Sequence, residues 1–127
     1  MHVLIISDSN TNLQWVNAPL AATGLSVNVV NACSMQEAIT LMSAIKFDMV
    51  LYDLSFSEKA MSENFKELTG FGVKIPLVVL TNNTGDPVAG EAIKHGATSH
   101  LVKDRLHISA MADAFKSILL QQQINYN

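Results

Sequence analysis

The sequence predicts one α/β domain in which a parallel sheet of five strands is covered by helices on both faces. Short apolar runs alternate with amphipathic stretches along the whole chain. Several of the runs are continuous in valine, isoleucine and leucine, as strands buried on both faces should be. The connections are short, and the 127 residues suit one domain. These observations together indicate a doubly wound fold.

Composition excludes several classes of protein. The chain is 49% hydrophobic and 15% charged, which is typical of a globular protein. Its net charge is −3 and its 8 lysines and arginines are scattered, which argues against a nucleic-acid partner. The N-terminal MHVLIISDSN has no basic region and too short an apolar stretch for a signal peptide or a membrane span. We therefore expect a cytoplasmic protein without a membrane partner.

The single cysteine also limits the structure. Cys33 has no partner for an internal disulfide and no zinc-like spacing. We expect it to be a small core residue near the end of a strand.

Five runs are predicted as strands because each is short, apolar and bounded by turn residues or helical patterns. They cover residues 2–6, 26–31, 49–54, 76–81 and 100–103.

Helical patterns fill the intervals between these runs. Ser34-Met35-Gln36-Glu37 is a capping box that predicts the start of the second helix. Asp86 and Pro87 predict the start of the fourth helix, which should stop at Gly96. Pro19 must kink or shorten the first helix. The other predicted spans are 11–23 for the first helix, 57–68 for the third, and a fifth from about residue 107.

Polar side chains stand where the predicted strands end. With the strand order 2-1-3-4-5, the ligand crevice lies beyond the C-terminal ends of the strands, between the first and third. The first polar residues after the apolar runs are Ser7 and Asp8, Asp53, Thr81 and Lys103. Two carboxylates, a hydroxyl and an ammonium should therefore meet at one edge of the sheet.

These stretches resemble the receiver domain of bacterial response regulators, and in particular the chemotaxis-regulator-like receivers. The resemblance covers essentially the whole chain and implies the flavodoxin-like fold. VLIISD resembles the family's first strand with its acidic pocket, and FDMVLYDL resembles the strand that bears the phosphorylated aspartate, here Asp53. PLVVLT carries the switch hydroxyl at Thr81, and GATSHLVK carries the lysine at Lys103. The four stretches are specific together, in this order and at this spacing.

The resemblance implies how the site would work. Mg²⁺ would be held by Asp8, Asp53 and the backbone carbonyl of Ser55, since it prefers oxygen ligands and water. Lys103 would pair first with Asp53 and then with a phosphoryl oxygen, and Thr81 would donate a hydrogen bond to the phosphoryl group.

The sequence departs from the family at three positions. Ser7 stands where the first of two adjacent acids is usual, which implies weak Mg²⁺ binding and slow or absent phosphorylation. Asp104 replaces the proline that usually follows the lysine, so either peptide isomer of Lys103-Asp104 is open. His100 occupies the position of the switch aromatic.

Four functions fit these residues to different degrees. The leading one is a Mg²⁺-dependent receiver that accepts a phosphoryl group on Asp53 from a histidine kinase or phosphotransfer partner, with at most slow self-dephosphorylation and no enzyme activity otherwise. The alternative is a pseudo-receiver that binds proteins without phosphorylation, favoured by Ser7. A flavin-binding domain lacks the glycine of a phosphate loop, and an aspartate-dependent phosphatase lacks a second acid at Ser55.

The resemblance also implies partners and boundaries. Residues 1–120 would form the receiver domain, and residues 121–127 a tail or the start of a linker towards an output domain. The face built from the fourth helix, fifth strand and fifth helix would mediate docking of a protein partner or a homodimer. It would include Glu91, Lys94, His100, Asp104 and Arg105.

Overall fold

The computed structural model describes most of the chain. The described residues are 1–7, 13–53, 61–70, 75–81, 87–94, 96–102 and 108–124. Within them, five strands alternate with five helices. None of the described helices is both long and apolar enough to cross a membrane.

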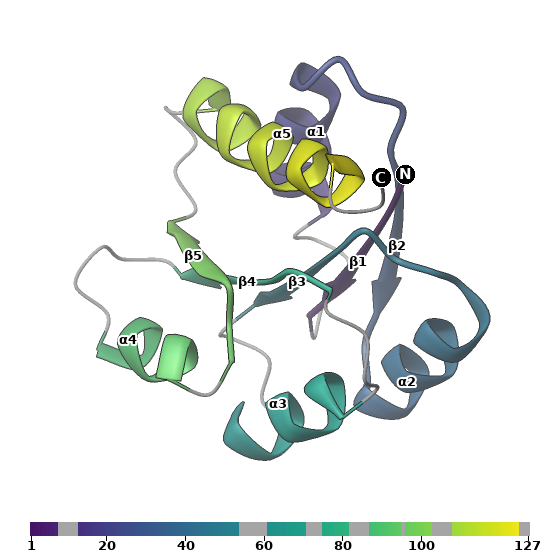
Figure 1. Cartoon of the computed structure of the whole chain (residues 1–127), viewed down its shortest axis with the longest axis vertical. Helices are drawn as coiled ribbons and strands as arrows, with labels where there is room; N and C mark the ends of the chain where they lie inside the picture. Colours follow the sequence, from purple (N-terminus) through teal and green to yellow (C-terminus); the bar gives the residue numbers. More distant parts are fainter. Residues whose placement is uncertain are drawn as a thin grey trace.

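The strands form one parallel sheet in the order β2-β1-β3-β4-β5, which confirms the predicted topology. Figure 1 shows this sheet in the middle of the molecule. All five residues of β3 and of β4 are buried, as expected for strands with a neighbour on each side and helices above and below. The strands are β1 (His2–Ile6), β2 (Asn28–Ala32), β3 (Met49–Asp53), β4 (Leu77–Thr81) and β5 (Ser99–Val102).

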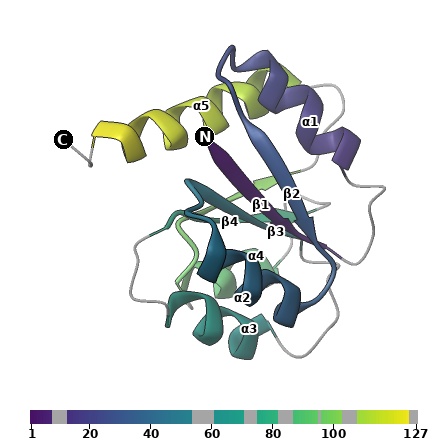
Figure 2. The ribbon, with the colours of Figure 1, turned by 90° about the vertical axis from the view of Figure 1, so that its right-hand side faces the viewer.

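The helices lie in two layers. In both Figure 1 and Figure 2, α1 and α5 lie on one side of the sheet, whereas α2, α3 and α4 lie on the other. A chain that alternates strands and helices buries both faces of its sheet in this way. The helices are α1 (Leu13–Ala22), α2 (Met35–Ala44), α3 (Met61–Thr69), α4 (Pro87–Lys94) and α5 (Ile108–Ile124).

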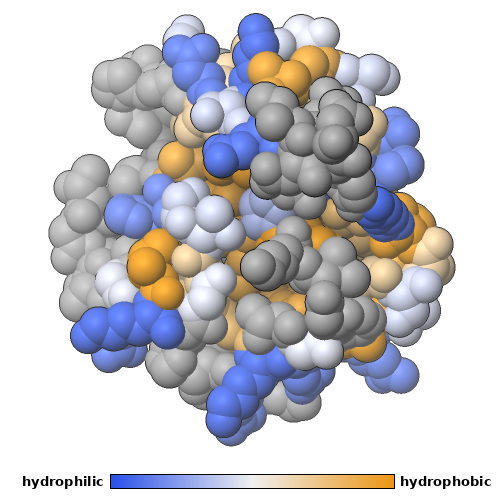
Figure 3. Space-filling view, viewed as in Figure 1, coloured by the Kyte–Doolittle hydropathy of each residue, from blue (hydrophilic) through white to orange (hydrophobic). Residues whose placement is uncertain are grey.

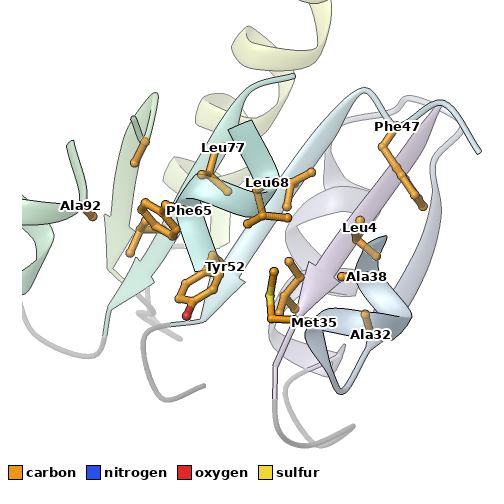
Figure 4. Packing of buried hydrophobic residues seen from close by; sticks show 14 residues of the cluster. Leu4, Ala32, Met35, Ala38, Phe47, Tyr52, Phe65, Leu68, Leu77 and Ala92 are labelled. Atoms are coloured by element: carbon orange, nitrogen blue, oxygen red, sulfur yellow. The ribbon is translucent and has the colours of Figure 1, made fainter. Parts of the chain in front are cut away.

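Two apolar cores result, one on each face. Val3, Leu51 and Leu80 point into the core beneath α1 and α5, together with Phe115. Their strand neighbours point to the other face, because successive side chains alternate. That second core, drawn in Figure 4, contains residues from β1, β2, β3, β4, α2, α3 and α4, among them Leu4, Ala32, Met35, Tyr52, Phe65, Leu77 and Ala92.

Helix ends follow the predicted signals. The Ser34 side chain accepts a hydrogen bond of 3.0 Å from the backbone N–H of Glu37 at the start of α2. Gly96 has a φ of 117°, a conformation that favours glycine, and follows the end of α4. Pro19 lies inside α1 (Leu13–Ala22), which ends one residue before the predicted end at Thr23, while the predicted start at residues 11 and 12 lies outside the described residues.

Other boundaries differ from the prediction by a few residues. β2 begins at Asn28 and not at residue 26, because its pairing with β1 starts with His2 opposite Asn28. α5 continues through the glutamines to Ile124. The division into a domain of residues 1–120 and a tail of residues 121–127 stays a prediction.

The prediction for Cys33 was wrong. Ala32 takes the last buried position of β2, and Cys33 follows it in the turn before the cap residue Ser34, where its side chain is exposed. Because Cys33 lies beyond the last residue of β2, its side chain does not face either core.

The molecular surface is mixed. On the face drawn in Figure 3, strongly hydrophilic residues are dispersed around the outline, with hydrophobic surface visible between them. Of the large hydrophobic side chains that the structure describes, Ile93 on α4 is the exposed one, at 43%.

Candidate functional site

Asp53 is the last residue of β3, the central strand of the sheet. It is 1% exposed, and it lies opposite Leu80 of the neighbouring β4. An ionised carboxylate withdrawn from water is costly unless positive charge or hydrogen-bond donors stabilise it. A buried acid at this place therefore indicates a specific role and not a solvated strand end.

Ser7 directly follows β1, which is one of the two strands that flank β3. Its backbone N–H donates a hydrogen bond of 3.1 Å to the carbonyl of Ala32, and its side chain is 0% exposed. The β1–β3 register pairs Ile6 with Tyr52, so one further step along both strands brings Ser7 level with Asp53. Parallel neighbours lie about 4.8 Å apart, which makes Ser7 and Asp53 adjacent at this edge.

Thr81 is the last residue of β4, the other strand that flanks β3. It is 1% exposed, and because Asp53 pairs with Leu80, Thr81 lies one residue further towards the C-terminal edge. Thr81 pairs in turn with Val102, the last residue of β5. Lys103 follows Val102 directly in the sequence.

The structure thus brings together one carboxylate and two hydroxyls from three strands. Asp53, Thr81 and Ser7 all lie at the carboxyl edge of the sheet, as predicted from the sequence. The other predicted site residues, Asp8, Ser55 and Lys103, lie outside the described residues, as does the peptide bond between Lys103 and Asp104. Their roles stay predictions.

His100 lies away from this edge. It is exposed on β5 and pairs with Val79, two residues before the strand end at Thr81. Its predicted role as a switch residue stays a prediction.

Asn31 belongs to the same edge and was not predicted. The Ser7 hydroxyl donates a hydrogen bond of 3.1 Å to Asn31 Oδ1, and Asn31 Nδ2 lies 3.1 Å from Cys33 Sγ. The hydroxyl hydrogen of Ser7 is therefore directed to Asn31. The available signal was that Asn31 is a polar residue at the end of the predicted strand of residues 26–31.

The donors at this edge suit a hard cation. Within the ranges that the structure describes, no cluster of three or more His, Cys, Asp or Glu side chains could hold a metal ion. Asp53 supplies a carboxylate and Ser7 a hydroxyl, and Mg²⁺ characteristically combines one or two carboxylates with water and phosphate oxygens. The described residues therefore fit Mg²⁺ as part of a site that other residues would complete.

The chain matches the response regulator receiver domain model over residues 3–116. A doubly wound domain with a buried aspartate at the end of its central strand is consistent with that match. The chain belongs to the response regulator receiver domain family, a family of signalling domains of two-component systems.

Curated relatives are larger proteins that contain a similar segment. The transcriptional regulatory protein ZraR of Klebsiella oxytoca is 29% identical over 101 residues, which are 80% of this chain and 22% of that protein. The two-component response regulator ARR10 of Arabidopsis thaliana is 22% identical over 129 residues, covering 100% of this chain and 23% of that protein. This chain therefore spans about a fifth of the length of these relatives.

Solved structures confirm the fold. The N-terminal domain of a response regulator/sensory box/GGDEF 3-domain protein from Carboxydothermus hydrogenoformans has a TM-score of 0.79 at 19% identity, with 100% of both chains covered. A two-component response regulator from Clostridium difficile has a TM-score of 0.77 at 23% identity, with 94% of this chain and 95% of that chain covered.

Proposed function

We propose that this chain is a phosphoryl-accepting receiver, in which Asp53 takes a phosphoryl group from a histidine kinase or a phosphotransfer protein. The observation that carries the proposal is the placement of Asp53, a buried carboxylate between two hydroxyl residues at the carboxyl edge of the sheet. Membership of the receiver family supports it.

The proposed reaction is a transfer between a phosphohistidine and Asp53. A carboxylate oxygen of Asp53 bonds to phosphorus as the phosphorus–nitrogen bond breaks, and the electron pair of that bond returns to the imidazole. Mg²⁺, when bound, would offset the negative charge that gathers during this step. Asp53, Asp8 and the backbone carbonyl of Ser55 would hold it, and the Ser7 oxygen would accept a hydrogen bond from a bound water.

Two further side chains would stabilise the phosphorylated state. Thr81 would donate its hydroxyl hydrogen to a phosphoryl oxygen, and Lys103 would place its ammonium against another. Movement of Thr81 towards the phosphoryl group, with His100 as the second switch residue, would carry the change to α4 and β5. The face of α4, β5 and α5 would then dock a protein partner, an output domain or a second copy.

A pseudo-receiver is the second candidate function. The observation that favours it is Ser7, a buried neutral residue adjacent to Asp53 at the place where the family usually has an acid. With one negative charge fewer, Mg²⁺ binding would be weak and the chain would act through protein contacts alone.

One experiment separates the two candidates. The protein is incubated with acetyl phosphate or beryllofluoride in the presence of Mg²⁺, and amide signals are followed by NMR while intact mass reports phosphorylation. For a receiver we expect shifts around Asp53 and Thr81 and an added phosphoryl mass, both lost in Asp53→Asn. Unmoved signals in a protein that remains folded would favour the pseudo-receiver.

A further inference from the structure

A hydrogen bond between side chains joins two neighbouring strands at the carboxyl edge of the sheet. The Ser7 hydroxyl, directly after β1, donates to Asn31 Oδ1 on β2 at 3.1 Å. The Ser7 side chain is 0% exposed, and Asn31 is half-buried. Such a bond holds both side chains in one arrangement, because it weakens steeply when its distance or angle changes.

Ser7, Asn31 and Asp53 lie on the same face of the sheet. Successive side chains of a strand alternate between the faces, and Ile5 and Leu51 belong to the core beneath α1 and α5. Two residues further along their strands, Ser7 and Asp53 therefore point to that same side. Asn31 pairs with Ile5 in the register, and paired residues of parallel strands share a face. The three polar side chains thus form a row across β2, β1 and β3.

Ser7 stands in the middle of this row, between two side chains with acceptor oxygens. A serine hydroxyl carries one hydrogen, and an amide oxygen and a carboxylate both accept hydrogen bonds. Ser7 donates this hydrogen to Asn31 on β2, whereas Asp53 lies on β3, on the other side of β1. Asn31 therefore directs the hydroxyl hydrogen away from the Asp53 carboxylate.

A second contact orients the amide of Asn31. Its Nδ2 lies 3.1 Å from Sγ of the exposed Cys33. An amide carries a donor nitrogen and an acceptor oxygen on the same carbon, so a partner for the nitrogen on one side directs the oxygen to the other side. In this orientation Asn31 is an acceptor towards Ser7, whereas a reversed amide would present a donor.

We propose that Asn31 is a positioning residue of the candidate phosphorylation site. By accepting the hydroxyl hydrogen of Ser7, it prevents Ser7 from donating that hydrogen to Asp53. A hydrogen bond to a carboxylate is strong and engages the electron pair with which an oxygen of Asp53 has to bond to phosphorus. The inference rests on the proposed function and extends it to a residue of β2 that acts through Ser7.

The test is a double-mutant cycle with Asn31→Leu, Ser7→Ala and the combined variant. Asn31→Leu removes the acceptor and allows Ser7 to donate to Asp53, whereas Ser7→Ala leaves no hydroxyl hydrogen to redirect. Phosphorylation by acetyl phosphate with Mg²⁺, followed by intact mass, should slow about fivefold in Asn31→Leu, the effect of about one hydrogen bond on the barrier. Introduced into Ser7→Ala, the same substitution should change the rate by less than about twofold. Equal slowing in both backgrounds would overturn the proposal, because Asn31 would then act without Ser7.

A measurement without metal or phosphoryl donor separates this inference from the proposed function. At pH 7 the NMR signal of the Asp53 carboxylate carbon should shift in Asn31→Leu relative to the wild type, and the combined variant should match Ser7→Ala. An unshifted signal in Asn31→Leu would rule out the positioning role even in a protein that accepts a phosphoryl group. A wild type that is never phosphorylated, with a shifted signal in Asn31→Leu, would contradict the proposed function and retain the positioning of Ser7.

Two further variants control for the substitution itself. Asn28→Leu is the matched control, because Asn28 is an exposed asparagine at the other end of β2. It should leave the Asp53 signal in place and the phosphorylation rate within about twofold of the wild type. Asn31→Ala removes the same acceptor with a smaller side chain and should act like Asn31→Leu. A loss of rate in Asn31→Leu that Asn31→Ala does not share would come from the bulk of leucine and would refute the role of the amide.

Discussion

Ser7 sets the charge of the candidate site. It lies fully buried beside Asp53, and it donates its hydroxyl hydrogen to Asn31. A hydroxyl in this place carries no negative charge. The attraction of the site for a divalent cation then depends on fewer carboxylates than in a receiver with two adjacent acids.

Ser7→Asp should strengthen Mg²⁺ binding. We expect a gain of about tenfold in affinity, or about 1.4 kcal/mol, because a second carboxylate beside Asp53 attracts the cation. Without Mg²⁺ the two carboxylates repel each other, so the metal-free variant should unfold at a lower urea concentration than the wild type. Calorimetric titration measures the first effect and urea unfolding the second.

Ser7→Ala is the control for this substitution. It removes the hydroxyl without adding charge and should show no gain in affinity. Equal Mg²⁺ affinity in Ser7→Asp and in the wild type would contradict the idea that Ser7 limits metal binding.

The sequence predicted the place of some residues at the carboxyl edge of the sheet and missed another, for physical reasons. Asp53 and Thr81 were identified because each is the first polar residue after an apolar strand, and strand ends of a parallel sheet share one edge. The bond between Ser7 and Asn31 was missed, because it depends on how β2 pairs with β1. No periodicity within either segment contains that information.

At the level of single elements, local signals predicted the helix ends well. The capping box at Ser34 and the glycine at Gly96 act through neighbouring backbone atoms, so the sequence alone determines them. Strand limits were less accurate, since they depend on the partner strand: β2 starts where His2 becomes available as its neighbour. The exposure of Cys33 follows from the same shift in the limits of β2.

Ser34→Ala should destabilise the protein through α2 alone. The Ser34 side chain accepts the backbone N–H of Glu37, and loss of such a cap costs about 1 kcal/mol. Urea unfolding followed by circular dichroism measures this loss. Ser43→Ala is the matched control, because the Ser43 hydroxyl donates to the carbonyl of Ile39 on the exposed surface of the same helix. It should change the free energy of unfolding by less than about 0.5 kcal/mol, and an equal effect of both substitutions would contradict the role of the cap.

At the scale of the whole molecule, one sheet separates two cores that depend on each other. Leu51 and Tyr52 are neighbours on β3, yet they belong to different cores. A loss of packing on either face therefore weakens strands on which the other core also rests. The topology was predictable because alternating strands and helices allow few arrangements of a parallel sheet.

Phe65→Leu should lower the urea midpoint of unfolding equally for the helix layers on both faces of the sheet. Phe65 of α3 is fully buried against the sheet, and the smaller side chain should cost about 1–3 kcal/mol. The single tryptophan, Trp15, belongs to α1, and α1 lies in the helix layer on the other side of the sheet from α3. Trp15 fluorescence and far-ultraviolet circular dichroism should give one common urea midpoint, lower than in the wild type. A fluorescence midpoint that stays at the wild-type value would show that the two layers unfold independently.

The strand order has a consequence for synthesis on the ribosome. Asp53 is translated before Thr81, but its strand lies between β1 and β4 and needs both neighbours. A nascent polypeptide that has left the exit tunnel only as far as α3 lacks β4, one of the two strands that flank Asp53. The Asp53 carboxylate therefore gains its full surroundings only after β4 has been added, so a translation product truncated after α3 would not display the complete candidate site.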